Sequence, residues 1–214
     1  MRISDIRSWV ECETYALHHP YREPPRVHVA AYVGTCAHGL LAGQTIEQIA
    51  EEHPSPLIFD RRTMTKAQAH TQAQEIAGIA ETALRAQNWL IVEQEVAVSA
   101  EQYVGHLDLR CWKEGSGDAI VDLKTGQLVS TGWLQVGGYL SAAEYADWGG
   151  ILHVPRESPH KVTLTLRPAK PLINEWTQWR KRIAEIESGA APRRSPGLHC
   201  SRCPLTTCPV RTVV

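Results

Sequence analysis

Two carboxylates and a lysine form the first candidate site of this 214-residue chain. Asp122 and Lys124 stand two positions apart in a predicted strand, residues 119–125, so both side chains are expected on one face. Asp108 lies on the preceding predicted strand, residues 103–112, and can bring a second carboxylate to the same place. Two converging carboxylates suit Mg²⁺ or Mn²⁺, and a neighbouring lysine can orient or deprotonate water. The set predicts metal-assisted phosphodiester hydrolysis, with a surface ion pair of Asp122 and Lys124 as the equal alternative on this short motif alone.

Two further motifs flank this set. Gln135 and Tyr139 stand four positions apart in the helix predicted over residues 131–147, so they share one helix face. Upstream, Gly34 precedes His38 by four positions in a predicted helical stretch. Taken in order, Gly-x-x-x-His, Gly-x-x-Asp, Asp-x-Lys and Gln-x-x-x-Tyr resemble the PD-(D/E)xK nuclease superfamily, in its RecB-like branch. That branch includes the CRISPR-associated RecB-like exonucleases and the nuclease domains of RecB and AddB, and the resemblance covers most of the chain.

The resemblance implies two kinds of role for the motif residues. One group would hold the divalent metal through carboxylates, a backbone carbonyl and an imidazole. In the other group a lysine would position the attacking water, while two helix residues would contact the DNA backbone or brace that lysine. The metal group is His38, Asp108, Asp122 and the carbonyl of Leu123, and the second group is Lys124, Gln135 and Tyr139.

Two pairs of residues near these motifs have open interpretations. Glu93 and Glu95 lie two apart on the strand predicted over residues 89–99 and share a face. One of them is a candidate third carboxylate, although a pair of solvated strand acids is the favoured interpretation. Gly137 and Gly138 interrupt the predicted helix, and they would permit close approach of DNA or of the sheet, or kink the helix.

Half of the six cysteines lie in the last 15 residues, in a C-x2-C-x4-C pattern formed by Cys200, Cys203 and Cys208. In a chain without a secretion signal, such a cluster favours metal binding over disulfides. Three thiolates leave a closed tetrahedral site one ligand short. Resemblance to the iron–sulfur members of the branch implies that Cys12 completes a 4Fe–4S cluster. The chain departs from their pattern in having Glu13 after this cysteine, and four rather than five residues in the last spacing.

The cysteine site has alternatives that the sequence leaves open. Zn²⁺ bound by the same four cysteines, or with His199 in place of one of them, is the main rival to the cluster. Cys36 and Cys111 are expected as small buried residues, with Cys36 retained as a second candidate for the fourth ligand.

The net charge of −1 conceals an uneven distribution. From residue 160 onward the chain has 10 Lys+Arg and 3 Asp+Glu, so the preceding part is acidic. A localised basic surface suits a polyanion, although a solvated helix end is the simpler interpretation. Trp176 and Trp179 are expected in the core rather than in stacking positions. The residues predicted to follow a DNA phosphate backbone are Arg180, Lys181, Arg182, Arg193, Arg194 and Arg202.

The element pattern predicts one mixed α/β domain. Helices are expected over residues 4–17, 64–88, 131–147 and 172–187, and strands over 89–99, 103–112, 119–125, 149–155 and 161–167, the first three as an antiparallel meander. The resemblance implies a restriction-endonuclease-like core, with a central mixed sheet flanked by helices and the two ends joined by the metal cluster. Residues 1–214 would then form a single nuclease domain, divided into a helical part (1–88), the core (89–170) and a C-terminal helix with the cysteine tail (171–214).

The leading functional hypothesis is an Mg²⁺- or Mn²⁺-dependent DNA exonuclease acting on single-stranded or end-containing DNA, with a structural 4Fe–4S cluster. The alternative is a non-cleaving DNA-binding or assembly subunit of a recombination or CRISPR complex, and the intact Asp/Asp/Lys set argues against it. An iron–sulfur electron carrier ranks third. No apolar run of about 18 residues occurs, so no membrane span is expected, and the start of the chain favours a cytoplasmic protein.

Overall fold

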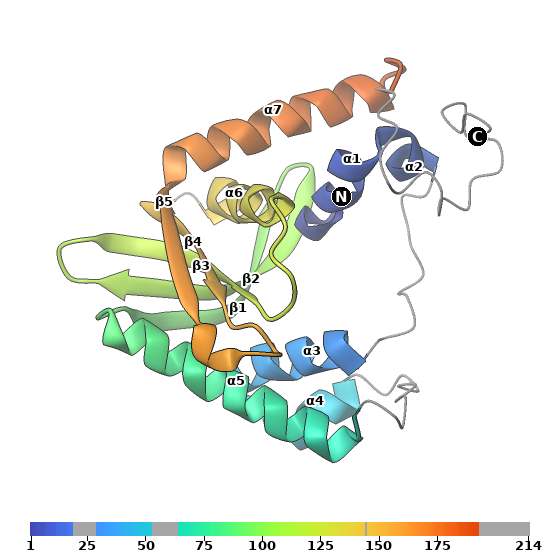
Figure 1. Cartoon of the computed structure of the whole chain (residues 1–214). Coiled ribbons are helices and arrows are strands. Elements are labelled where there is room, and N and C mark those ends of the chain that lie inside the picture. The colour runs from blue at the N-terminus through green and yellow to red at the C-terminus, as the bar shows by residue number, and fades with distance from the viewer. Residues whose placement is uncertain (19–28, 53–63, 144, 193–214) are drawn as a thin grey trace.

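A five-stranded mixed sheet forms the centre of the molecule (Figure 1). The computed structural model describes residues 1–18, 29–52, 64–143 and 145–192. The strands lie in the order β1-β2-β3-β4-β5, with β3 and β4 parallel and the other neighbouring pairs antiparallel. The predicted meander and the α/β fold with a mixed sheet are therefore confirmed. The strands are β1 (Leu90–Ala100), β2 (Tyr103–Lys113), β3 (Gly117–Lys124), β4 (Trp148–His153) and β5 (Thr163–Pro168).

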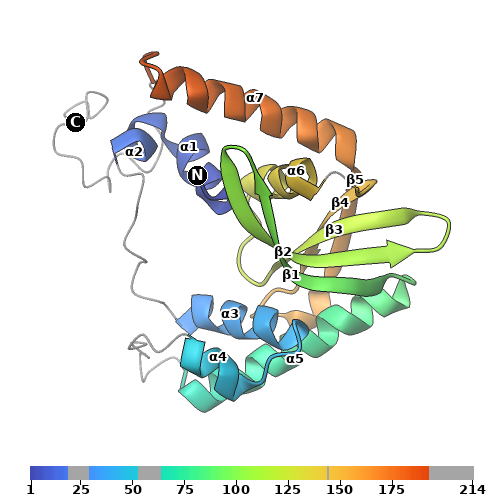
Figure 2. The ribbon, with the colours of Figure 1, turned by 180° about the vertical axis from the view of Figure 1, so that it is seen from behind.

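Helices cover both faces of this sheet (Figures 1 and 2). One layer comprises α3 (Val29–Leu41), α4 (Ile46–Glu52) and α5 (Lys66–Ala86). The opposite layer comprises the N-terminal segments η1 (Ile3–Asp5), α1 (Ile6–Glu11) and α2 (Glu13–His18), together with α6 (Thr131–Ala143) and α7 (Ala169–Glu187). A short 3₁₀ turn, η2 (Pro159–Lys161), connects β4 to β5.

The sequence of β3 explains why both of its faces are buried. Val121 and Leu123 pack in the core beneath α3 and α5, whereas Ile120 packs in the core beneath α6 and α7. Parallel strands that are covered on both faces are expected to be apolar nearly throughout. A charged residue in such a strand is costly to bury unless it is paired or functional, and Asp122 is that residue here.

Helix α5 begins with a capping box and buries a narrow face. The Thr65 side chain accepts a hydrogen bond from the Gln68 backbone, while the Gln68 side chain accepts one from the Thr65 backbone. Its buried residues recur every three or four positions and include several alanines, which lets α3 approach closely. The predicted helix over residues 64–88 is thus confirmed. The buried set is Ala69, Ala73, Ile76, Ala80 and Leu84.

Two helix predictions are wrong in their limits. The helix expected over residues 4–17 is broken at Cys12, where the chain turns so that Glu13 can pair with Arg182 of α7. The helix expected over 131–147 ends at Ala143. Asp147 is instead held just before β4, where its N–H donates to the Asp118 carbonyl and its carbonyl accepts from the Ala169 N–H. No helix among the described residues is both long and apolar enough to cross a bilayer.

The two glycines of α6 permit close packing of α6 against other elements of the chain. A Cβ at Gly137 would lie 2.5 Å from the Leu172 carbonyl oxygen of α7, and one at Gly138 would lie 2.7 Å from Ile3. Trp176, expected in the core, is buried against the same glycine pair. The contacts are thus with α7 and η1, and the interpretation that the glycines admit DNA or the sheet is replaced by a packing role.

Candidate metal centre

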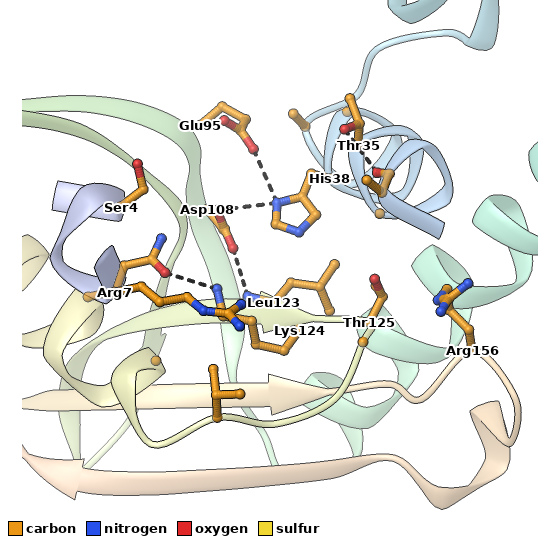
Figure 3. Close-up of a pocket in the computed structure, with 18 of the residues that line it drawn as sticks. Ser4, Arg7, Thr35, His38, Glu95, Asp108, Leu123, Lys124, Thr125 and Arg156 are labelled. Carbon is orange, nitrogen blue, oxygen red and sulfur yellow. Dashed lines mark hydrogen bonds and ion pairs between the residues drawn. The ribbon is translucent and has the colours of Figure 1, made fainter. Parts of the chain in front are cut away.

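A cleft of about 950 Å³ opens where the C-terminal end of β3 meets α3, α6 and the N-terminal segment (Figure 3). The carboxyl ends of parallel strands are the usual position for ligand sites in α/β sheets. Its walls include His38 from α3, Asp108 from β2, Lys124 from β3 and Gln135 from α6. These are four of the residues predicted from the sequence, and they come from four separate elements.

Two glycines account for how the histidine and the first aspartate reach the cleft. A Cβ at Gly34 would lie 3.1 Å from Thr125 Oγ1, so α3 lies against the end of β3 and carries His38 one turn further on. A Cβ at Gly105 would lie 2.8 Å from the Tyr139 ring, so β2 passes close to α6 three residues before Asp108. Close packing therefore explains why glycine occupies the first position of the Gly-x-x-x-His and Gly-x-x-Asp motifs.

Asp108 is held between the histidine and the backbone of β3. His38 Nδ1 lies 3.2 Å from Asp108 Oδ1, and the Leu123 N–H donates to Asp108 Oδ2 at 2.7 Å. Burial lowers the pKa of His38, but the charge of Asp108, the close contact with its carboxylate and the nearby Glu95 raise it to about 10. Burial raises the pKa of Asp108, but the charge and hydrogen bond of His38, the charge of Lys124 and the Leu123 N–H together lower it by more, so the net shift is downward. Without a metal, the pair is thus an imidazolium with a carboxylate.

Asp122 is buried, with 1 % of its side chain exposed, and it is poorly satisfied. Its Oδ2 lies 2.6 Å from Lys124 Nζ, outside hydrogen-bond geometry, and neither oxygen accepts a hydrogen bond from the residues that the structure describes. Burial, followed by the charge of Asp108, raises the pKa of Asp122 to about 7 despite the opposing effect of Lys124. The Lys124 ammonium is thus an incomplete partner for this buried carboxylate, and a divalent ion between the acids would add positive charge there.

Lys124 is fixed by a chain of polar side chains from α6. Its Nζ donates to Gln135 Oε1 at 3.1 Å, and Gln135 Nε2 donates to Tyr139 Oη at 2.7 Å. Tyr139 is buried, and burial raises the pKa of its hydroxyl far above the usual range, so it stays neutral. Of the two roles expected for the helix pair, this geometry favours bracing of the lysine.

The structure distinguishes the two strand acids that the sequence left open. Glu93 Oε2 lies 3.2 Å from Arg110 Nη1, as the expectation of an ordinary strand acid implies. Glu95 Oε1 instead lies 3.8 Å from His38 Nδ1, and the Glu95 backbone has a φ of 47°, which is unusual for a residue other than glycine. Possible ligand atoms of His38, Glu95 and Asp108 lie within 4.8 Å of one another. Glu95 is thus the nearer of the two acids to His38, while its side chain stays 38 % exposed, as expected for a strand acid that solvent reaches.

The donor set fits a hard or borderline divalent ion. Carboxylate oxygens suit Mg²⁺ and Mn²⁺, while imidazole is a better ligand for Mn²⁺ than for Mg²⁺. The residues that would hold the ion are His38, Glu95 and Asp108, whose ligand atoms cluster in the cleft, with Asp122, which does not line the cleft, as the further predicted carboxylate. The unsatisfied oxygens of Asp122 are the observation that favours this fit.

Besides Lys124 and His38, two arginines that the sequence did not single out bring positive charge to the cleft. Arg7 of α1 and Arg156, after β4, line the cleft from its two sides (Figure 3). Arg182, expected on a DNA path, instead donates to both carboxylate oxygens of Glu13, at 3.0 and 2.8 Å. Arg180 bonds to the side chain of Gln102. Neither of these α7 arginines lines the cleft.

Two of the described cysteines are buried, as the sequence predicted. Cys36 and Cys111 are fully buried, which places Cys36 in the α3/α5 core and disfavours it as a ligand for the tail. Cys12 is half-buried between α1 and α2. Arg182, bound to the adjacent Glu13, also donates to the Ala191 carbonyl, so residue 191 and the residue after Cys12 share one partner. The remaining predicted tail residues lie outside the described residues: Arg193, Arg194, His199, Cys200, Arg202, Cys203 and Cys208.

Comparison with known proteins gives support for the fold. No protein-family model and no curated protein matches this chain. A crystal structure from Eubacterium rectale, named "Putative exonuclease", is 18 % identical, with a TM-score of 0.63 over 94 % of this chain and 86 % of its own. At that identity the likeness confirms the α/β fold with its central mixed sheet. A second structure, SSO0001, is 11 % identical over 94 % of both chains, and its TM-score of 0.38 is too low to support an argument.

Proposed function

We propose that this protein is a divalent-metal-dependent nuclease that hydrolyses phosphodiester bonds of DNA. The observation that carries the proposal is Asp122, a buried carboxylate beside Asp108 whose oxygens accept no hydrogen bond within the described structure. The Lys124 ammonium lies against this carboxylate and donates a hydrogen bond to Gln135. Paired carboxylates with an adjacent, oriented lysine are suited to hydrolysis at phosphorus, where negative charge develops.

The chain's own residues divide the work of this reaction. Mg²⁺ or Mn²⁺, when bound by Asp108, Asp122, His38 and Glu95, would supply Lewis-acid chemistry at the phosphate. Lys124 would orient the attacking water and stabilise charge on the phosphate oxygens. Because Gln135 and Tyr139 fix its ammonium, these two are positioning residues.

For the substrate, we propose single-stranded or end-containing DNA, with exonucleolytic cleavage favoured over endonucleolytic. The resemblance of His38 and of the Gln135–Tyr139 pair to the RecB-like motifs supports this preference. Basic side chains on both sides of the cleft, from Arg7 and Arg156, would support binding of a polyanion.

A second metal site is proposed at the C-terminal end of α7. Cys12, Cys200, Cys203 and Cys208 would bind a 4Fe–4S cluster, with Zn²⁺ as the alternative, and would join both ends of a single domain spanning residues 1–214. The support is the position of Cys12 next to Glu13, whose partner Arg182 also holds residue 191. As partners of the nuclease we propose proteins of recombination or of CRISPR adaptation.

Cleavage of end-labelled DNA tests the proposed function. The protein is incubated with linear and with circular single-stranded DNA of the same sequence, with Mn²⁺ or with a chelator. We expect Mn²⁺-dependent degradation of the linear strand and much slower loss of the circle. Equal cleavage of both would replace exonuclease by endonuclease, and cleavage of neither, in Mg²⁺ or Mn²⁺, would contradict the nuclease function and favour a non-cleaving binding subunit.

A further inference from the structure

The segment that follows β4 is fixed against the end of β3, next to the candidate metal centre. The Val154 N–H donates to the Lys124 carbonyl at 2.9 Å, and the Arg156 N–H donates to the Thr125 carbonyl at 3.2 Å. From the other side, Gln72 Nε2 of α5 donates to the Arg156 carbonyl at 3.0 Å. The backbone of Arg156 is therefore held by two separate elements, so its side chain starts from a fixed position.

The guanidinium of Arg156 has only a weak partner within the described structure. Its Nη2 lies 3.5 Å from Glu157 Oε1, and the Glu157 side chain is 79 % exposed. Ion pairs at such exposed positions contribute little, because solvent screens them. Arg156 lines the same cleft as the acids, as Figure 3 shows, so its guanidinium can exchange this contact for an anion bound there.

The position of Arg156 relative to Lys124 suggests which anion it binds. Thr125 directly follows Lys124, and Arg156 lies across one hydrogen-bonded strand spacing, about 4.8 Å, from Thr125. The arginine thus starts beyond the lysine, on the Thr125 side of the metal centre. Along one strand of a DNA duplex, successive phosphates advance by about 3.4 Å of helix axis, so a second phosphate would lie within reach of an extended arginine.

We propose that Arg156 binds the phosphate next to the one that is cleaved, through the paired N–H groups of its guanidinium. The inference rests on the proposed nuclease function and narrows its substrate. The site takes a strand that continues past the cleaved bond on the Thr125 side, in preference to a compound with one isolated phosphodiester.

Two substrates measured on the same enzyme test this inference. One is a twelve-nucleotide oligothymidylate, and the other is bis(p-nitrophenyl) phosphate, which has a single phosphodiester. For Arg156→Gln we expect the ratio of kcat/KM for the oligonucleotide to kcat/KM for the small ester to fall about tenfold, mainly through KM. The slope of log KM against log salt should fall by about 1, because one phosphate contact is lost. Arg156→Lys should give an intermediate ratio, since it keeps the charge without the planar pair of donors.

Arg85→Gln is the matched control. Arg85 lies on α5, outside the cleft, and forms an exposed ion pair with Glu81 at 2.6 Å, so it should leave the ratio unchanged. An unchanged ratio in Arg156→Gln, or an equal loss on both substrates, would overturn the role of Arg156 while the nuclease function stood. If the wild-type protein hydrolysed neither substrate, the nuclease function itself would fall, and this inference with it.

Discussion

Asp122 is the residue at which burial and charge conflict most in this protein. Its carboxylate is buried beside that of Asp108, and Lys124 meets it from only one side. The sequence predicted this meeting, since a strand places residues two apart on one face. The sequence did not predict that Glu95, and not Glu93, lies near His38. That placement depends on a β-bulge near Glu93 and on an unusual backbone angle at Glu95.

The pH dependence of stability should report the burial of Asp122. Its pKa is about 7 in the folded protein and near 3.8 in the unfolded chain, so the folded state retains a proton that the unfolded chain loses. Stability from this group is therefore present at low pH and is lost as the pH rises toward 7. We expect the metal-free wild type to melt progressively lower than Asp122→Asn from pH 5 to pH 8, by at least 2–4 °C, roughly 1 kcal/mol for a chain of this size. Thermal melts with Glu114→Gln as an exposed control would check this, and a difference that does not vary with pH would contradict it.

Metal binding should restore the stability that the folded protein loses when Asp122 ionises. A divalent ion competes with protons for the same ligands, so it binds more tightly as the pH rises. We expect Mn²⁺ to raise the melting temperature of the wild type more at pH 8 than at pH 5.5, and to leave Asp122→Asn almost unchanged, because ligand binding to the folded state shifts unfolding. Equal stabilisation of both proteins by Mn²⁺ would place the ion elsewhere.

At the scale of elements, the sequence predicted types and order better than limits and contacts. The strands were predicted from β-rich and alternating sequence, and α5 from an Ala/Gln/Glu-rich stretch with few helix breakers. The break at Cys12 instead follows from the Glu13–Arg182 pair, which joins distant segments. The same limit applied to Gly137. A glycine within a helix is visible in the sequence, but the element that packs on it is not.

Two helix glycines should respond to alanine with opposite signs. Gly137→Ala would place Cβ 2.5 Å from a backbone oxygen of α7, so we expect a loss of about 1–3 kcal/mol of stability. Gly78 of α5 has no atom within 4 Å of an added Cβ, so Gly78→Ala should gain about 0.5–1 kcal/mol from helix propensity. Urea unfolding of the two variants measures both values, and a neutral Gly137→Ala would show that α6 and α7 are less closely packed than described.

At the scale of the whole molecule, the cleft is assembled from segments that are far apart in the chain. His38, Asp108 and Lys124 were accessible to motif reasoning because each lies in a short recognisable pattern. Arg156 was not, since its place depends on hydrogen bonds to Thr125 and to α5. The basic C-terminal quarter was also misjudged in part, because charge counts do not show that Arg182 is used within the fold.

In the proposed metal site that joins the two ends of the domain, Cys12 is a ligand, whereas the other described cysteines are not. Cys12→Ser should lose bound iron or zinc, and with it any brown colour, and should melt lower than the wild type. Cys111→Ala should keep its metal content, because Cys111 is buried in the sheet core. Elemental analysis of anaerobically purified protein measures this. Full metal content in Cys12→Ser would remove Cys12 from the ligand set.

The most direct test of the nuclease mechanism is the rate at which Lys124→Ala degrades linear single-stranded DNA in Mn²⁺. Lys170→Ala, an exposed lysine at the start of α7, is the matched control. If Lys124 orients water and stabilises charge in the transition state, kcat should fall by about 10²–10³-fold while Lys170→Ala retains wild-type activity. A Lys124→Ala protein that cleaves as fast as the wild type would contradict the proposed mechanism.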